Sequence, residues 1–241
     1  GPCGLFAAWQ LTLAGYAPLI LERGKQVEDR SADVERFWKT GILQPDSNVQ
    51  FGEGGAGTFS DGKLNTLVKD PVGRNRKVLE LFVEAGADEE ILYEQKPHLG
   101  TDELIGIVTY IRKEIERLGG EVRFHCQMTD LLIQNGQIYG VQATDLKTGE
   151  MEEIVSGQVV LAVGHSARDT FEKLLERKIT MEPKPFAVGV RVEHPQSMIN
   201  ASQYGSVADQ LPAASYKLTY RTGKGRQVYT FCMCPGGYVV N

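Results

Sequence analysis

The sequence predicts an α/β domain followed by a β-rich part, and three observations support this. The chain opens on a glycine-initiated apolar helix that leads into a short strand. Residues 51–64 are very rich in glycine. After Gly164, helices and strands in alternation give way to strand-like segments with polar connections. Because alternating helices and strands are typical of α/β domains, we expect a first domain over residues 1–166 and a second over residues 167–241.

The composition is that of an ordinary globular protein. The 241 residues are 41% hydrophobic and 24% charged, and the net charge of -5 argues against nucleic acid as a partner. We see no signal peptide and no apolar run near the roughly 20 residues that span a bilayer. We therefore expect no membrane partner. Four cysteines are too few for a disulfide framework, so we expect a cytoplasmic protein. Its oligomeric state is left open.

The first elements follow from apolar spacing. Residues 4–14 form a mostly apolar helix pattern that Gly15 ends. Residues 17–22, APLILE, predict a short buried strand that closes on Glu22. A short helix is expected around residues 32–39.

Two longer helices come next. Residues 74–85 predict the first, ended by Gly86, and the second runs from Thr101, a predicted N-cap, to Leu118. Three strand segments then follow, over residues 121–128, 130–145 and 152–164. The sequence QNGQ is a turn signal within the second segment. The apolar run VVLAVG, residues 159–164, ends the third and predicts a strand covered on both faces. The second part holds a predicted helix and three strand-like segments, over residues 166–178, 185–194, 216–222 and 226–234.

The opening GPCG has the form of a nucleotide-binding turn. The dinucleotide fingerprint G-x-G-x-x-G lies between a strand and a helix, and Gly1 and Gly4 supply its G-x-x-G part. Glu22 lies 18 positions after Gly4, close to the spacing of the carboxylate that binds a ribose. An acidic residue there disfavours the 2′-phosphate of NADP. The alternative is a packing turn, since the first glycine and the preceding strand are absent.

The stretch FGEGGAGTFSDGKL contains four glycines in six positions, from Gly52 to Gly57. Such a backbone can approach a ligand closely and present its N–H groups to it. The alternative is a flexible lid or linker. The apolar residues Phe51, Phe59 and Leu64 would be poor choices for a solvated linker, so we favour ligand contact.

These motifs together resemble a known family. GPCG followed by a helix and LILERG, then EGGAGTFSDGKL, the strand segments and VVLAVGH resemble FAD-dependent oxidoreductases of the glutathione-reductase fold type. HLGTDEL, PFAVGVRVEHPQ and FCMCPGGYVV extend a resemblance to the poorly characterised bacterial FAD-dependent dehydrogenases over essentially the whole chain. The resemblance implies a Rossmann-like FAD/NAD(P)-binding domain of three layers with a β-meander, plus a β-rich substrate domain. It also implies a piece that lacks the first strand and a C-terminal part.

The resemblance also implies the residues that hold FAD. Gly1 and Gly4 would face the pyrophosphate, and Glu22 and Arg23 would lie at the adenosine ribose. The strand after the long helix would pass the adenine at Gln127 and Met128. The part of FAD between the pyrophosphate and the flavin ring would be lined by Gly54, Gly55, Ala56, Gly57, Ser60 and Asp61. Gly164, at the end of the apolar run VVLAVG, would also approach the cofactor. Val163 departs from the common threonine there.

No catalytic side chain is assigned, because a flavin itself carries the redox chemistry. Cys232 and Cys234 could be redox-active or half of a metal site, although core packing explains them equally well. Asp61 and Lys63 could transfer a proton beside the flavin, or form a solvated turn. The four histidines lack metal-ligand spacing, so no metal is predicted.

We therefore expect an FAD-dependent oxidoreductase that moves hydride between a small-molecule substrate and the flavin, with NADH or NADPH open as the hydride donor. One alternative is a noncatalytic or accessory FAD-binding protein, for example in RNA modification. Another is a plain NAD-dependent dehydrogenase, which would not need the glycine-rich stretch. Because the first strand is absent, we expect the 241-residue piece alone to bind FAD weakly or not at all.

Overall fold

The structure is a computed structural model that describes residues 1–59, 62–64, 69–94, 97–231 and 233–235. The chain forms two compact units, unit 1 over Gly1–Glu182 and unit 2 over Pro183–Asn241. The predicted domain boundary after residue 166 falls inside unit 1, before the helix α5.

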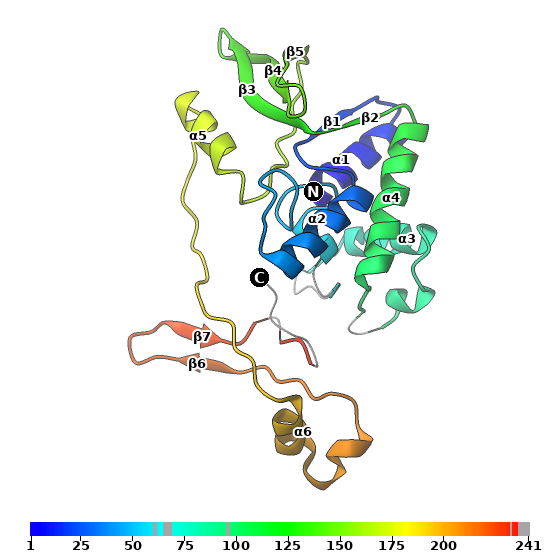
Figure 1. The fold of residues 1–241 in the computed structure, drawn as a ribbon, viewed down its shortest axis with the longest axis vertical. Helices are drawn as coiled ribbons and strands as arrows, with labels where there is room; N and C mark the ends of the chain where they lie inside the picture. Colours follow the sequence, from blue (N-terminus) through cyan, green and yellow to red (C-terminus); the bar gives the residue numbers. More distant parts are fainter. Residues whose placement is uncertain (60–61, 65–68, 95–96, 232, 236–241) are drawn as a thin grey trace. The chain divides into compact units, whose positions relative to one another are not determined.

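Unit 1 is a mixed α/β structure with two small sheets (Figure 1). Its helices are α1 (Pro2–Leu13), α2 (Val27–Thr40), α3 (Arg74–Glu84), α4 (Thr101–Arg117) and α5 (Arg168–Glu176), with short 3-10 turns η1 (Ala56–Phe59) and η2 (Glu89–Leu92). Its strands are β1 (Leu19–Glu22), β2 (Glu121–Phe124), β3 (Cys126–Gln134), β4 (Gln137–Asp145) and β5 (Met151–Val155).

The first sheet is the parallel pair β1–β2, in which Leu19 lies opposite Glu121 and Glu22 opposite Phe124. The predicted strand over residues 159–164 is wrong, because the described residues there have no strand structure. An apolar run becomes a strand only where another strand hydrogen-bonds to it. No described strand pairs with this one, and Val160 stays 64% exposed. The segment does pass α1, since a Cβ on Gly4 would lie 3.5 Å from the Cβ of Ala162.

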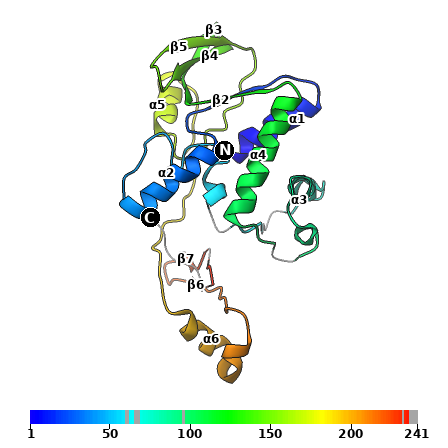
Figure 2. The same cartoon turned by 45° about the vertical axis from the view of Figure 1, so that its right-hand side comes forward.

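The second sheet is the antiparallel meander β3–β4–β5, as the turn signal and strand patterns predict. Asn135 and Gly136 connect β3 to β4 with φ angles of 52° and 75°, the left-handed pair that a tight hairpin requires. Helix α5 lies beside this sheet (Figure 2). Leu174 of α5 packs with Leu131 and Val141 in a small apolar cluster, and so α5 belongs to unit 1.

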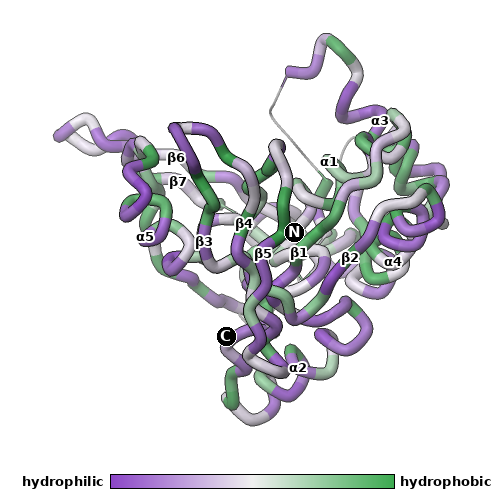
Figure 3. Tube along the Cα trace, turned by 90° about the horizontal axis from the view of Figure 1, so that it is seen from above, coloured by the Kyte–Doolittle hydropathy of each residue, from purple (hydrophilic) through white to green (hydrophobic). Residues whose placement is uncertain are grey.

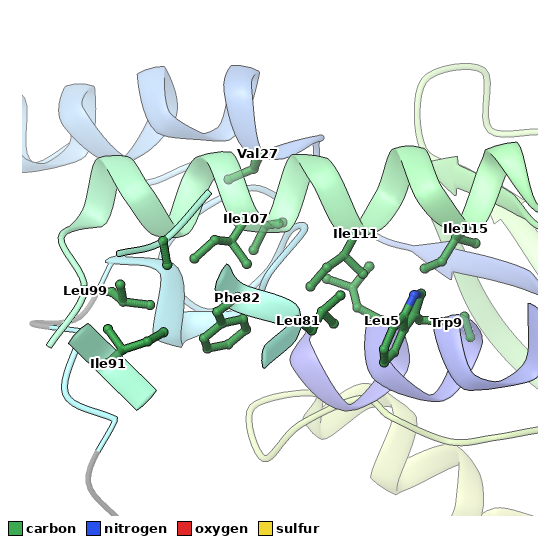
Figure 4. Close-up of a cluster of buried hydrophobic side chains, with 13 residues drawn as sticks. Leu5, Trp9, Val27, Leu81, Phe82, Ile91, Leu99, Ile107, Ile111 and Ile115 are labelled. Atoms are coloured by element: carbon green, nitrogen blue, oxygen red, sulfur yellow. The ribbon is translucent and has the colours of Figure 1, made fainter. Parts of the chain in front are cut away.

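The main core of unit 1 lies where α4 meets α1 and α3. Figure 4 shows Leu5 and Trp9 of α1 and Leu81 of α3 on the side of α4 that carries Ile111 and Ile115. Figure 3 shows hydrophobic and hydrophilic residues following one another along α4, as expected for a helix with one buried face. The apolar spacing of these three helices therefore specifies the core.

Two helix starts differ from the predictions. The N-cap of α4 is Gly100 rather than Thr101, and the side chain of Glu103 accepts a hydrogen bond of 2.7 Å from the Gly100 N–H. Helix α2 begins at Val27, well before the predicted residue 32. The Val27 N–H donates to the carboxylate of Glu53 over 2.8 Å, so a residue from the glycine-rich stretch caps this helix.

Unit 2 contains the helix α6 (Gln196–Tyr204), the 3-10 turn η3 (Gly205–Gln210) and a hairpin of the three-residue strands β6 (Thr219–Arg221) and β7 (Gln227–Tyr229). The strand predicted over residues 185–194 is wrong, because these residues have no strand structure and none of the described strands pairs with them. Helix α6 was not predicted. No helix in the described ranges is long and apolar enough to cross a bilayer.

The core predicts a clear contrast between two isoleucines. Ile111→Ala should lower the free energy of unfolding by about 2–5 kcal/mol, because it leaves a cavity between α4 and α1. Ile42→Ala, at a position 60% exposed, should change it by less than about 0.5 kcal/mol. Urea denaturation of both variants measures the difference, and equal losses would contradict the described core.

Candidate functional site

The carboxylate of Glu22 lies at the centre of the candidate site. Its Oε1 atom accepts hydrogen bonds from the backbone N–H of Gly24, over 3.0 Å, and of Gly52, over 3.1 Å. Its Oε2 atom lies 3.5 Å from the backbone nitrogen of Gly1. The end of β1 thus brings together the start of α1 and the glycine-rich stretch, three segments that the sequence analysis assigned to one site.

The glycine-rich stretch packs directly against the start of α1. A Cβ on Gly55 would lie 3.0 Å from Pro2 Cδ and 3.1 Å from the Cα of Gly1. A Cβ on Gly54 would lie only 2.2 Å from the hydroxyl oxygen of Thr58. Both glycines also have positive φ angles. Part of the glycine content is therefore explained by close contacts between protein atoms.

Several backbone N–H groups around this contact find no acceptor among the residues that the structure describes. The first turn of a helix leaves its N–H groups without intrahelical acceptors, and α1 has no side-chain cap and no acidic residue in its first turn. In the described part of the chain, the N–H groups of Gly54 and Ala56 also make no hydrogen bond. Unpaired N–H groups beside a helix N-terminus form an environment suited to an anion.

A buried ion pair between Glu53 and Arg112 connects the glycine-rich stretch to α4, and it was not predicted from the sequence. Glu53, 2% exposed, accepts from Arg112 Nε of α4 over 2.8 Å in addition to capping α2. Burial raises the pKa of Glu53, while the hydrogen bond from Val27 and the charge of Arg112 oppose that rise. Arg30 of α2 is fully buried against the same stretch. No local sequence signal identifies contacts between segments so far apart.

A second cluster joins two more of the predicted residues. Asp169 of α5 accepts a hydrogen bond from Arg23 and one of 2.7 Å from Gln127 Nε2. The guanidinium of Arg23 also lies 4.5 Å from the ring centroid of Phe51. Arg23 is thus held beside the glycine-rich stretch, and Asp169 is another residue that the sequence did not indicate.

A cavity of about 180 Å³ adjoins the glycine-rich stretch. Its walls are mainly apolar and come from α1, α3, α4 and the stretch itself, with Phe6, Phe82, Leu104 and Ile107 beside Gly54 and Gly57. Such a space suits an apolar group next to the polar environment at the start of α1.

The remaining predicted residues lie in different places. Met128 is in β3 opposite Ala143, and it packs on the apolar cluster of the meander. Gly164 has a φ of 72° and follows the segment that passes Gly4. Three predicted residues, Ser60, Asp61 and Cys232, lie outside the described residues.

One comparison with known proteins concerns FAD. Residues 185–241 match the model of a family described as "FAD-dependent protein, C-terminal domain-like". This match indicates an association with FAD. The chain is also 49% identical over 243 residues to an uncharacterized protein of Clostridium beijerinckii. That alignment covers all of this chain and 44% of the relative, so the chain spans less than half the length of the relative it matches.

The packing of the glycine-rich stretch predicts a large loss of stability at one glycine and a small loss at another. In Gly52→Ala the new Cβ would lie 2.4 Å from Arg30 Cδ, at a φ of 125°. We expect a loss of about 1–3 kcal/mol in the free energy of unfolding. Gly57→Ala is the matched control, because no atom of the described residues lies within 4 Å of its added Cβ, and its loss should stay below about 0.5 kcal/mol. Thermal or urea denaturation measures both, and a tolerated Gly52→Ala would contradict this packing.

Proposed function

We propose that the protein is an FAD-dependent oxidoreductase of the glutathione-reductase fold type, within the bacterial FAD-dependent dehydrogenases. The observation that carries the proposal is the contact of the α1 N-terminus with Gly55 beside the carboxylate of Glu22. A dinucleotide needs these two features together, an anion-binding helix start and an acceptor for ribose hydroxyls. The match of residues 185–241 to an FAD-dependent family supports FAD as the ligand.

The residues present fit such a cofactor. The unpaired N–H groups of Gly54 and Ala56 and the start of α1 would hold the pyrophosphate. Oε2 of Glu22 would accept from the adenosine ribose, since Oε1 is already bonded to two backbone N–H groups. The negative charge of Glu22 would repel a 2′-phosphate, which favours a ligand without one.

When bound, FAD would supply the hydride-transfer chemistry. The chain's own residues would bind and orient the ligand, and the apolar walls of the cavity beside Gly57 would pack against an apolar group placed there. The substrate is proposed to be a small molecule, and hydride is proposed to come from it or from NADH or NADPH. Flavin reduction separates this proposal from a noncatalytic FAD-binding role, because only an oxidoreductase needs its flavin reduced during turnover.

The carboxylate predicts a test of the FAD site with the whole gene product. Glu22→Gln keeps an oxygen for Gly24 and Gly52 but replaces Oε2 by an N–H donor. The affinity for FAD should fall about tenfold or more, because a hydrogen bond to a charged group is lost. Titration of flavin fluorescence measures the dissociation constant.

Glu121→Gln, on the neighbouring strand β2, is the control because it makes the same charge change at an exposed side chain. It should bind FAD as the wild type does. A wild-type protein that takes up no FAD would overturn the proposal. Tightly bound FAD that no reduced nicotinamide or substrate screen reduces in stopped-flow measurements would leave the noncatalytic role.

A further inference from the structure

The side chain of Arg30 is unusual because it is fully buried and binds backbone carbonyls. Its Nε atom donates to the carbonyl of Asn48 over 2.8 Å, and Nη2 donates to that of Val49 over 3.0 Å. Its Nη1 atom donates to the carbonyls of Glu53 and, over 3.0 Å, of Gly55. A guanidinium can reach acceptors on several sides at once because its five N–H groups form a rigid planar fork.

Burying the guanidinium of Arg30 costs solvation free energy, and the hydrogen bonds described for it go to backbone carbonyls rather than to carboxylates. Removal from water lowers the pKa of Arg30 to about 10, although the nearby carboxylates of Glu22 and Glu53 oppose the shift. All four of its hydrogen-bond acceptors are carbonyl oxygens of residues 48–55. The contacts therefore act on the direction of the peptide groups in this stretch.

The direction of a carbonyl fixes the direction of the next N–H. In a planar trans peptide the C=O of one residue and the N–H of the following residue point to opposite sides. Arg30 binds the carbonyls of Glu53 and Gly55, so the N–H groups of Gly54 and Ala56 point away from the guanidinium. These are the two N–H groups that find no acceptor among the described residues, and Gly55 between them lies against the start of α1.

We infer that Arg30 is a positioning residue for a diphosphate: by holding the carbonyls of Glu53 and Gly55, it presents the N–H groups of Gly54 and Ala56 to the phosphate oxygens. The inference rests on the proposed function, because it assigns the diphosphate of FAD to this side of the stretch. Arg30 touches no phosphate itself and acts only through the backbone. Its side chain also fills the space that the absent Cβ of Gly52 leaves, which ties the glycine at 52 to the arginine at 30.

The test compares Arg30→Met and Arg30→Lys in the whole gene product, with FAD and inorganic diphosphate as separate probes in titration calorimetry. Methionine removes the charge and the donors, whereas lysine keeps the charge and loses the planar fork. Both variants should lose about tenfold or more in affinity for each probe, because hydrogen bonds to charged phosphate oxygens are lost. Ile115→Ala, a fully buried core position on α4, controls for general destabilisation and should bind both probes like the wild type.

Each outcome decides the inference. Wild-type affinity in Arg30→Met, or losses no larger than in Ile115→Ala, would overturn it. Full binding by Arg30→Lys would also overturn it, because charge and not peptide direction would then matter. If the wild type binds diphosphate but not FAD, the proposed function fails and the diphosphate affinities of the variants still decide the role of Arg30. A wild type that binds neither probe overturns both.

A measurement on the wild type keeps the inference falsifiable if the Arg30 variants do not fold. Amide hydrogen exchange followed by NMR should show Gly54 and Ala56 exchanging readily in the free protein and protected when diphosphate or FAD is added. Protection of both amides already in the free protein would contradict the inference, and so would continued rapid exchange with either probe bound.

Discussion

The arrangement of unit 1 around the candidate site depends on two buried charged side chains that bind backbone groups. Glu53, within the glycine-rich stretch, caps α2 through the Val27 N–H and reaches α4 through Arg112. Arg30, within α2, binds carbonyls of the same stretch in return. Each segment therefore fixes the other. A buried ion costs solvation free energy, and hydrogen bonds to several fixed dipoles offset that cost only when the geometry is right.

This reciprocal contact explains why a stretch so rich in glycine has a defined shape. Glycine alone would make the backbone mobile, since it has the largest conformational freedom of any residue. Here Gly52 makes room for Arg30, Gly54 for Thr58 and Gly55 for Pro2. The glycines are thus needed for packing as well as for any ligand. What favours a ligand is the direction of the unpaired N–H groups and their place beside the start of α1 and Glu22.

Features encoded by local patterns were predicted from the sequence. Helices α3 and α4 were predicted from the spacing of their own apolar residues and from the glycines that follow them. These signals lie in or beside the helices that they predict. The hairpin at Asn135 and Gly136 is equally local. By contrast, the start of α2 depends on Glu53, 26 residues away in sequence, so no pattern at the helix itself could reveal it.

The apolar runs at residues 159–164 and 185–194 show where prediction from local patterns fails. Their composition predicts strands, but a strand needs a neighbour that satisfies its backbone, and the described strands offer none. The long-range contacts of Arg30 and Asp169 were missed for a related reason, because charged residues in a polar segment are usually solvated. The sequence thus indicated which segments meet at the candidate site, while the side chains that hold them together became visible only in the folded chain.

The most direct test of the account is a crystal structure of the whole gene product with FAD bound. We expect diphosphate oxygens about 2.7–3.2 Å from the backbone nitrogens of Gly54 and Ala56, next to the start of α1. We also expect a ribose hydroxyl at Oε2 of Glu22. A diphosphate bound elsewhere, with these nitrogens facing solvent or protein, would contradict it.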